Sequence, residues 1–310
     1  MAGVHKSGMH RATAVMLAAW CAMSAPAAPM ASGREAEPAT ELRKETMAAF
    51  ERYTKLTEAR IEEEIRAAQN GGDKPGALLR VDMLPAAERE AAYQKLRRGE
   101  VVVERLETLD GGKKIEVPHG MIHHWLGTVF IPGATVDGVL ALVEDYDRHQ
   151  EIYAPEVERS KLLEREGDDF KAFLRFRKKK IVTVVVDTEH AAHYGRLSAT
   201  RAYSISHTTR VNEVENPGEP NEREKPQGND RGFLWHLYTY WRFEERDAGP
   251  DGAGAGVYVQ CESVTLTRDI PVLLAWLIKP FVTGVPRESL EGVLGATRKA
   301  ALPKPAPPAH

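Results

Sequence analysis

The sequence predicts an α+β domain in which an antiparallel sheet is closed by a C-terminal helix. Between residues 170 and 267, runs of alternating apolar and polar residues are separated by loops rather than by helices, as in antiparallel sheets. An apolar segment at residues 271–282 then leads into an amphipathic helix at residues 288–300. Together these patterns predict one large sheet packed against one long helix.

The N-terminus has the pattern of a secretory signal peptide. Lys6 and Arg11 precede an apolar run at residues 12–25, and small residues follow at Ala25 and Ala27. The run of about 14 residues is shorter than the roughly 20 that span a bilayer. We therefore expect residues 1–27 to be removed and the protein to be exported to the periplasm or the exterior.

The next segment, residues 28–98, is predicted to form a tether and a helical region. Residues 28–40 are rich in Pro, Ala and Glu without periodicity. Residues 41–70 have the spacing of a helix with a narrow apolar stripe, and residues 86–97 predict a second, shorter helix. The apolar stripe of the first helix includes Phe50, Tyr53, Ile61 and Ile65.

The main domain is predicted to cover residues 99–302, followed by a disordered tail at residues 303–310. It begins with a hairpin turning at Asp110-Gly111-Gly112 and a strand at residues 121–131. Thr135 then opens an amphipathic helix that ends near Tyr146. Further strands are predicted at residues 170–176, 181–187, 202–214, 232–243 and 257–267.

Composition argues against several classes of function. Removing residues 1–27 lowers the 42 basic residues to 40, against 45 acidic ones, so no electrostatic attraction to nucleic acid is expected. Only Cys261 remains, which precludes an intramolecular disulfide. His119 and His123 would be roughly 13 Å apart on a strand, too far to share a metal ion. No metal or cofactor is therefore expected.

Two parts of the main domain carry a recognisable pattern. The first is the helix at residues 139–146, followed by Ile152 to Val157, and the second comprises residues 240–243, 257–259 and 266–271. The first part resembles the helix of the START-like superfamily, which includes polyketide cyclase-like and coenzyme Q-binding-like proteins. The second part is similar to the penultimate strands and the helix entry of exported members of that superfamily. The resemblance covers about residues 99–302.

This resemblance implies a helix-grip fold, a curved antiparallel sheet wrapped around the C-terminal helix. It also implies a tunnel between sheet and helix that binds lipids, isoprenoids or polyketides. An independent physical reason supports the tunnel, because one sheet covered by one helix leaves part of its apolar face unfilled.

The candidate ligand-binding residues are those that strand alternation and helix periodicity place on the inner face. The alternate positions of the same strands carry polar residues such as Ser204, Ser206 and Gln260, which we expect to face outward. The inward candidates are His123, Trp125, Leu174, Phe176, Tyr203, Ile205, His207, Trp235, Leu237, Val259, Cys261, Trp276, Leu277, Leu290 and Leu294.

Arg242 and Glu262 have two possible roles. With Arg210 they share one parity on successive strands, which is typical of cross-strand ion pairs on the outer surface. If the parity reverses, Arg242 and Glu262 instead form a polar patch inside the tunnel, where they would hold a ligand head group or act as acid and base.

Three hypotheses for function follow. The first is noncatalytic binding, transport or sequestration of a hydrophobic small molecule or lipid. The alternative is an aromatase, cyclase or hydrolase that uses His207, Arg242 or Glu262 as acid or base in the same cavity. The third is an interaction module whose first helix pairs with a partner.

A basic run at residues 175–180 is also a candidate for transient contact with a membrane surface. The sequence leaves the ligand and the oligomeric state open.

Overall fold

A computed structural model describes residues 41–71, 78–179, 183–248, 254–269 and 275–303, with side chains from residue 284 onward in the last range. These residues all belong to one unit, residues 38–310. The predicted signal peptide at residues 1–27, the tether before residue 41 and the tail from residue 304 lie outside the described residues. None of the described helices is long and apolar enough to cross a membrane.

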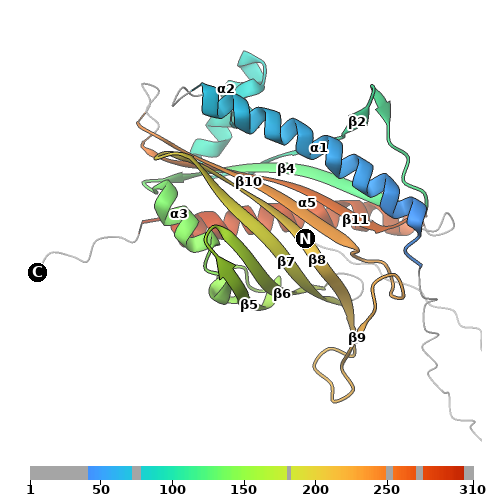
Figure 1. Ribbon diagram of the computed structural model, residues 1–310. Helices are drawn as coiled ribbons and strands as arrows, with labels where there is room; N and C mark the ends of the chain where they lie inside the picture. Colours follow the sequence, from blue (N-terminus) through green and yellow to red (C-terminus); the bar gives the residue numbers. More distant parts are fainter. Residues whose placement is uncertain (1–40, 72–77, 180–182, 249–253, 270–274, 304–310) are drawn as a thin grey trace, which may run out of the picture. The chain divides into compact units, whose positions relative to one another are not determined.

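The centre of the domain is a nine-stranded antiparallel sheet in the order β1-β4-β11-β10-β8-β7-β6-β5, with β9 paired to β8 (Figure 1). A separate two-stranded hairpin consists of β2 (Leu109–Asp110) and β3 (Lys113–Lys114). The antiparallel sheet predicted from the loops between strands is confirmed. The strands of the large sheet are β1 (Val102–Arg105), β4 (Gly120–Pro132), β5 (Val157–Glu166), β6 (Asp169–Lys179), β7 (Thr183–Ser198), β8 (Arg201–Glu215), β9 (Arg223–Lys225), β10 (His236–Arg246) and β11 (Gly256–Arg268).

One face of this sheet, the inner face, is covered by the C-terminal helix α5 (Ala275–Ala301). The helix approaches β4 closely because Gly127 has no side chain. A Cβ atom at this position would lie 2.5 Å from Leu294 Cδ1 and 3.2 Å from Leu290 Cγ. Leu290 and Leu294 pack there with Val259 and Phe243 from the sheet. The predicted packing of one long helix on one sheet is confirmed.

Shorter helices close one side of the inner face. They are α3 (Val136–Val143), the 3₁₀ turn η2 (Tyr146–Arg148) and α4 (His149–Ile152). Thr135 caps α3 as predicted, since its hydroxyl oxygen accepts a hydrogen bond from the Gly138 amide at 3.2 Å. Val139 and Val143 of α3 are buried in the same core as Leu290.

The opposite, outer face is covered by the N-terminal helices, for which the sequence suggested only one role, the pairing of the first helix with a partner. Helix α1 (Lys44–Asn70) runs along the sheet (Figure 1). Its apolar stripe, Phe50, Tyr53, Ile61 and Ile65, is buried against Trp235, Tyr240, Val264 and Leu266. The 3₁₀ turn η1 (Arg80–Met83) and α2 (Ala86–Arg97) pack on β4 and β11 around Phe130 and Tyr258. The sheet is therefore buried on both faces over much of its area.

Strand β7 is longer than predicted. The sequence indicated a strand at residues 181–187 followed by a loop, whereas β7 continues to Ser198 and pairs with both β6 and β8. Ala191, Ala192 and Gly195 have weak strand propensity, but pairing on both sides overrides it. The Tyr203 ring covers Gly195, where a Cβ atom would lie 2.3 Å from the ring.

Candidate ligand cavity

A cavity of about 400 Å³ lies between the inner face of the sheet and helix α5. Its wall is formed by β6, β7, β8, β10 and β11, by α5 and by the α3–α4 region. The volume falls in the range of roughly 300–1,000 Å³ that is usual for small-molecule sites. The cavity exists because one helix cannot cover the whole width of the sheet.

Most of the cavity wall is apolar. Leu174 and Phe176 from β6 and Val186 from β7 form one side, and Leu290 and Val293 from α5 form the opposite side. Leu237 and Trp241 from β10 complete the wall between them. Water held against such a surface makes few hydrogen bonds, so an apolar guest would release it favourably.

Tyrosine hydroxyl groups form one polar end of the cavity, near α3 and α4. Tyr146 and Tyr194 hydroxyl oxygens are 3.0 Å apart, and the Tyr194 hydroxyl also donates to the Val143 carbonyl at 3.2 Å. The Tyr153 hydroxyl lies 3.2 Å from Thr297 Oγ1 on α5. Burial raises the pKa of Tyr146 and of Tyr153 to about 12. These hydroxyls therefore remain neutral hydrogen-bonding groups near neutral pH.

Two histidines on the cavity wall are also neutral near neutral pH. Burial lowers the pKa of His149 to about 4, although its hydrogen bond to the Val143 carbonyl opposes the shift. Burial and the nearby His149 lower the pKa of His190 to about 4. His190 Nε2 lies 2.9 Å from Thr188 Oγ1. Neither ring brings positive charge to the cavity.

The structure brings some of the predicted ligand-binding residues to the cavity wall. Leu174, Phe176, Leu237, Cys261 and Leu290 all line it, and their contact with a ligand stays a prediction. Burial and the nearby Glu262 raise the pKa of the Cys261 thiol well above its ordinary value, which keeps it protonated.

A second group of predicted residues lies on the inner face beside the cavity. Trp125 and His123 are opposite Ser263 and Thr265, which line the cavity. Val259 and Leu294 are fully buried in the core that joins β11 to α5. Trp276 and Leu277 fall in the first turns of α5, but their side chains lie outside the described residues.

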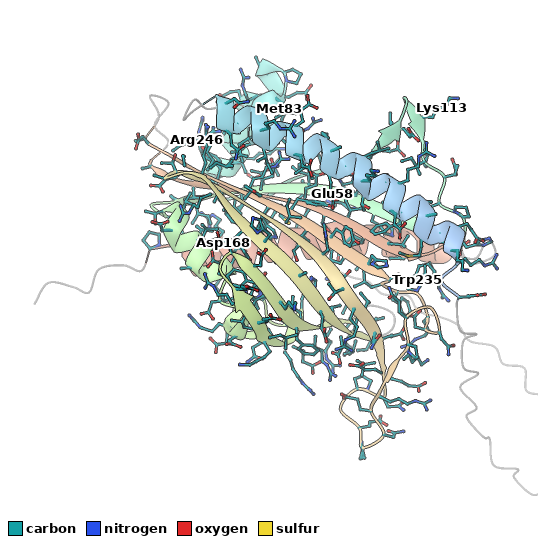
Figure 2. All side chains as sticks on the ribbon, viewed as in Figure 1. Glu58, Met83, Lys113, Asp168, Trp235 and Arg246 are labelled. Atoms are coloured by element: carbon teal, nitrogen blue, oxygen red, sulfur yellow. The ribbon has the colours of Figure 1, made fainter. Side chains whose placement is uncertain are left out.

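Four predicted cavity residues lie instead on the outer face, and the prediction that they point inward is wrong. Tyr203, Ile205 and Trp235 pack in the core beneath α1. His207 Nε2 lies 2.7 Å from Glu58 Oε1. Glu58 belongs to α1 and is labelled in Figure 2. The physical reason is that α1 buries the outer face. Apolar and aromatic side chains therefore occur on both faces of the sheet and do not identify the inner face.

Arg242 and Glu262 are also on the outer face, so the interpretation as a polar patch inside the tunnel is wrong. The other interpretation, cross-strand ion pairs on the outer surface, is also wrong in one respect, because both side chains are buried under α1 and not exposed to solvent. Arg242 Nη2 contacts Glu64 Oε2 of α1 at 2.5 Å, and Glu262 pairs with Arg60 of α1. Arg210 is not part of this group, since it pairs with Glu189 and Glu224.

A hydrogen-bond chain completes the buried polar layer under α1. His124 Nε2 lies 2.7 Å from Glu262 Oε1, and His124 Nδ1 lies 2.9 Å from the Tyr53 hydroxyl. Burial raises the pKa of Glu262, but His124 and Arg60 outweigh it and hold the pKa below its ordinary value. Each buried charge of this layer thus has a partner on α1 or on a neighbouring strand.

The basic run on β6 is largely paired with carboxylates. Arg175 donates to both Asp187 oxygens at 2.6 and 2.7 Å and is 6% exposed. Arg177 pairs with Glu158, and Lys178 pairs with Glu156 at the edge of the cavity. Lys178 also donates to the Ser289 hydroxyl of α5 at 3.1 Å. Lys180 lies outside the described residues.

Sequence reasoning missed the hydroxyl side chains of the cavity wall. Ser204, Ser206, Thr239, Ser263 and Thr265 all line it. Ser204 and Ser206 were expected to face outward because they are polar. Strand alternation counted from Cys261 identifies these residues, because Cys261, Trp241 and Ser204 are cross-strand neighbours on one face of the sheet.

Within the described part of the chain, no cluster of three or more His, Cys, Asp or Glu side chains could hold a metal ion.

Comparisons with known proteins return START-like structures. The chain matches the STAR-related lipid transfer protein from Xanthomonas axonopodis with 16% identity and a TM-score of 0.37, over 63% of this chain and 98% of that one. It matches human STARD10 with 10% identity and a TM-score of 0.38, over 70% and 81%.

A third match is the Zhui aromatase/cyclase from Streptomyces sp. R1128, with 13% identity and a TM-score of 0.37, over 58% of this chain and 94% of that one. No protein-family model and no curated protein matches the sequence. The helix-grip arrangement therefore rests on this chain's own sheet and helices, in which an antiparallel sheet holds α5 against its inner face.

Proposed function

We propose that this protein binds a hydrophobic small molecule or lipid in the cavity between the sheet and α5, and that it carries or sequesters this ligand without transforming it. The observation that supports the proposal is the cavity of about 400 Å³ with a mainly apolar wall. Burying apolar ligand surface there contributes about 25 cal/mol per Å².

The alternative, an enzyme acting in the same cavity, depended on three residues that lie outside this cavity. His207, Arg242 and Glu262 were its candidate acids and bases, and all three contact α1 on the outer face. A group that acts on a bound substrate has to reach the reacting atom within hydrogen-bond distance. The sheet itself separates these three side chains from the cavity.

We also propose that the protein acts outside the cytoplasm. The support is the order of basic residues, apolar run and small residues within residues 1–27. N-terminal sequencing of the exported protein would test this directly. A chain that begins near residue 28 is expected, whereas an intact Met1 in a cytoplasmic fraction would contradict export.

A titration with Nile red, a neutral apolar dye, tests the binding function. We expect saturable fluorescence enhancement with one dye molecule per chain, because the cavity wall is mainly apolar. Competition by long-chain lipids should reverse the signal. Failure of the folded protein to bind the dye or any competing lipid would contradict the proposal.

A further inference from the structure

A row of hydroxyl side chains crosses the cavity wall. Ser206 on β8 is opposite Thr239 on β10, and Thr239 is opposite Ser263 on β11. All three line the cavity. Side chains directly opposite each other have Cβ atoms about 4.5–5.5 Å apart, so one ligand atom can reach two of them. We call Ser206, Thr239 and Ser263 the hydroxyl row.

The hydroxyl row has unused hydrogen-bonding capacity. Among the described residues, none of its three side chains has a hydrogen-bond partner, although Ser206 is only 8% exposed. The same holds for the neighbouring Ser204, which is 2% exposed. Thr267 differs, since it lines the same cavity but its hydroxyl donates to the Arg268 carbonyl at 3.1 Å. Thr239 and Ser263 are partly exposed, so hydroxyls of the row are open to a hydrogen-bonding group of a ligand in the cavity.

Trp125 on β4 is opposite Ser263 but is not among the residues that line the cavity. Its indole Nε1 is buried without a hydrogen-bond partner among the described residues. The hydroxyl row itself therefore supplies the polar groups that face the cavity. Because hydroxyls both donate and accept, a hydroxyl or carbonyl oxygen on a ligand suits each member of the row.

The groups around the row favour a neutral oxygen over a charged one. The row itself holds no ionised side chain, and burial keeps the nearby His190 neutral. Among the described residues, the charged side chains of the cavity wall are Glu156, Arg177 and Lys178, which are already paired with each other or with Glu158. None of these described side chains offers a carboxylate or phosphate at the row a free countercharge.

We propose that the ligand is a neutral, mainly apolar molecule with a hydroxyl or carbonyl oxygen within its skeleton, and that the hydroxyl row binds this oxygen. This inference rests on the proposed function and adds the chemical class of the ligand. A pure hydrocarbon fills the same space but leaves the row without partners.

Displacement of Nile red by matched competitors tests the inference. The competitors are a long-chain alkane, the ketone of the same length with a mid-chain carbonyl, and the corresponding secondary alcohol. A hydrogen bond with a net contribution of about 1 kcal/mol predicts that the ketone and the alcohol bind roughly fivefold more tightly than the alkane. The variant Ser206→Ala/Thr239→Val/Ser263→Ala should lose this preference and keep its affinity for the alkane.

Thr267→Val is the matched control, because it removes a cavity-wall hydroxyl that already has a partner. It should keep the preference for oxygenated competitors. If the triple variant does not fold, Thr239→Val alone should still lower the preference. Equal affinity of the wild-type protein for alkane and ketone would overturn the inference and leave the proposed function standing. A triple variant that keeps the preference would also overturn it, whereas no binding of dye or competitor would count against the proposed function itself.

Discussion

Arg242 on β10 and Glu64 on α1 form an ion pair on the outer face of the sheet, with Arg242 only 2% exposed. A second guanidinium nitrogen of Arg242 donates to the Leu78 carbonyl at 2.9 Å. One side chain thus ties the sheet to two N-terminal segments, α1 and the chain before η1. This arrangement makes Arg242 part of the cover on the outer face and separates it from the cavity.

Replacing this arginine should lower stability without changing ligand binding. Arg242→Met leaves the buried Leu78 carbonyl without this donor and leaves Glu64 with Arg60 as its remaining cation, so we expect a loss of about 1–3 kcal/mol in the free energy of unfolding. Urea denaturation measures this loss. Arg210→Met removes pairs that are about one third exposed and should cost less than about 1 kcal/mol. Weakened Nile red binding by folded Arg242→Met would contradict the placement of Arg242 outside the site.

Helix α1 should be a required part of the fold rather than a free docking element. Phe50 is 1% exposed, and its ring stacks on the His236 ring with the two ring centroids 5.2 Å apart. Phe50→Ala should therefore cost about 3–5 kcal/mol of unfolding free energy. Leu163→Ala, at a half-exposed position, should cost less than about 0.5 kcal/mol. Unchanged stability of Phe50→Ala, with a change of oligomeric state instead, would favour a partner-binding role for α1.

Filling the cavity should block ligand binding. Val186 lines the cavity and is buried, so Val186→Phe places ring atoms where the ligand would lie. We expect at least a tenfold loss of Nile red affinity, with overpacking costing about 1–3 kcal/mol of stability. Val102→Phe makes the same change on β1, beside Phe130 and Tyr258 on the outer face, and should bind the dye normally. Equal dye binding by the two variants would place the dye elsewhere.

The buried His190 should make stability depend on pH. Burial, aided by His149, lowers its pKa in the folded state to about 4, against 6.5 for an unperturbed histidine. The unfolded chain therefore binds more protons between pH 6.5 and 4, so stability falls as the pH drops through this window. A shift of this size corresponds to roughly 3 kcal/mol. His190→Leu should reduce the loss measured by urea denaturation, whereas an unchanged loss would show that His190 is not buried neutral.

The sequence predicted the architecture well because that prediction depended on local signals. Loops between strands indicated an antiparallel sheet, Thr135 marked the start of α3, and the apolar C-terminal segment indicated the helix that covers the inner face. These features depend on turn chemistry, capping and periodicity, which neighbouring residues determine.

The facing of the strands could not be predicted in the same way, because it depends on what covers each face. Tyr203 and Trp235 were placed inward as aromatic residues, but α1 gives the outer face an apolar core of its own. Ser204 and Ser206 were placed outward as polar residues, yet they line the cavity. Which face each of these side chains lies on becomes clear only from the long-range contact between α1 and the sheet.

Purification without detergent, followed by solvent extraction and mass spectrometry, measures directly whether the cavity holds a ligand. We expect the wild-type protein to release close to one neutral, mainly apolar molecule per chain, and Val186→Phe to release much less. Wild-type protein that is consistently empty and also fails to take up apolar molecules added to it would contradict a ligand-binding cavity beneath α5.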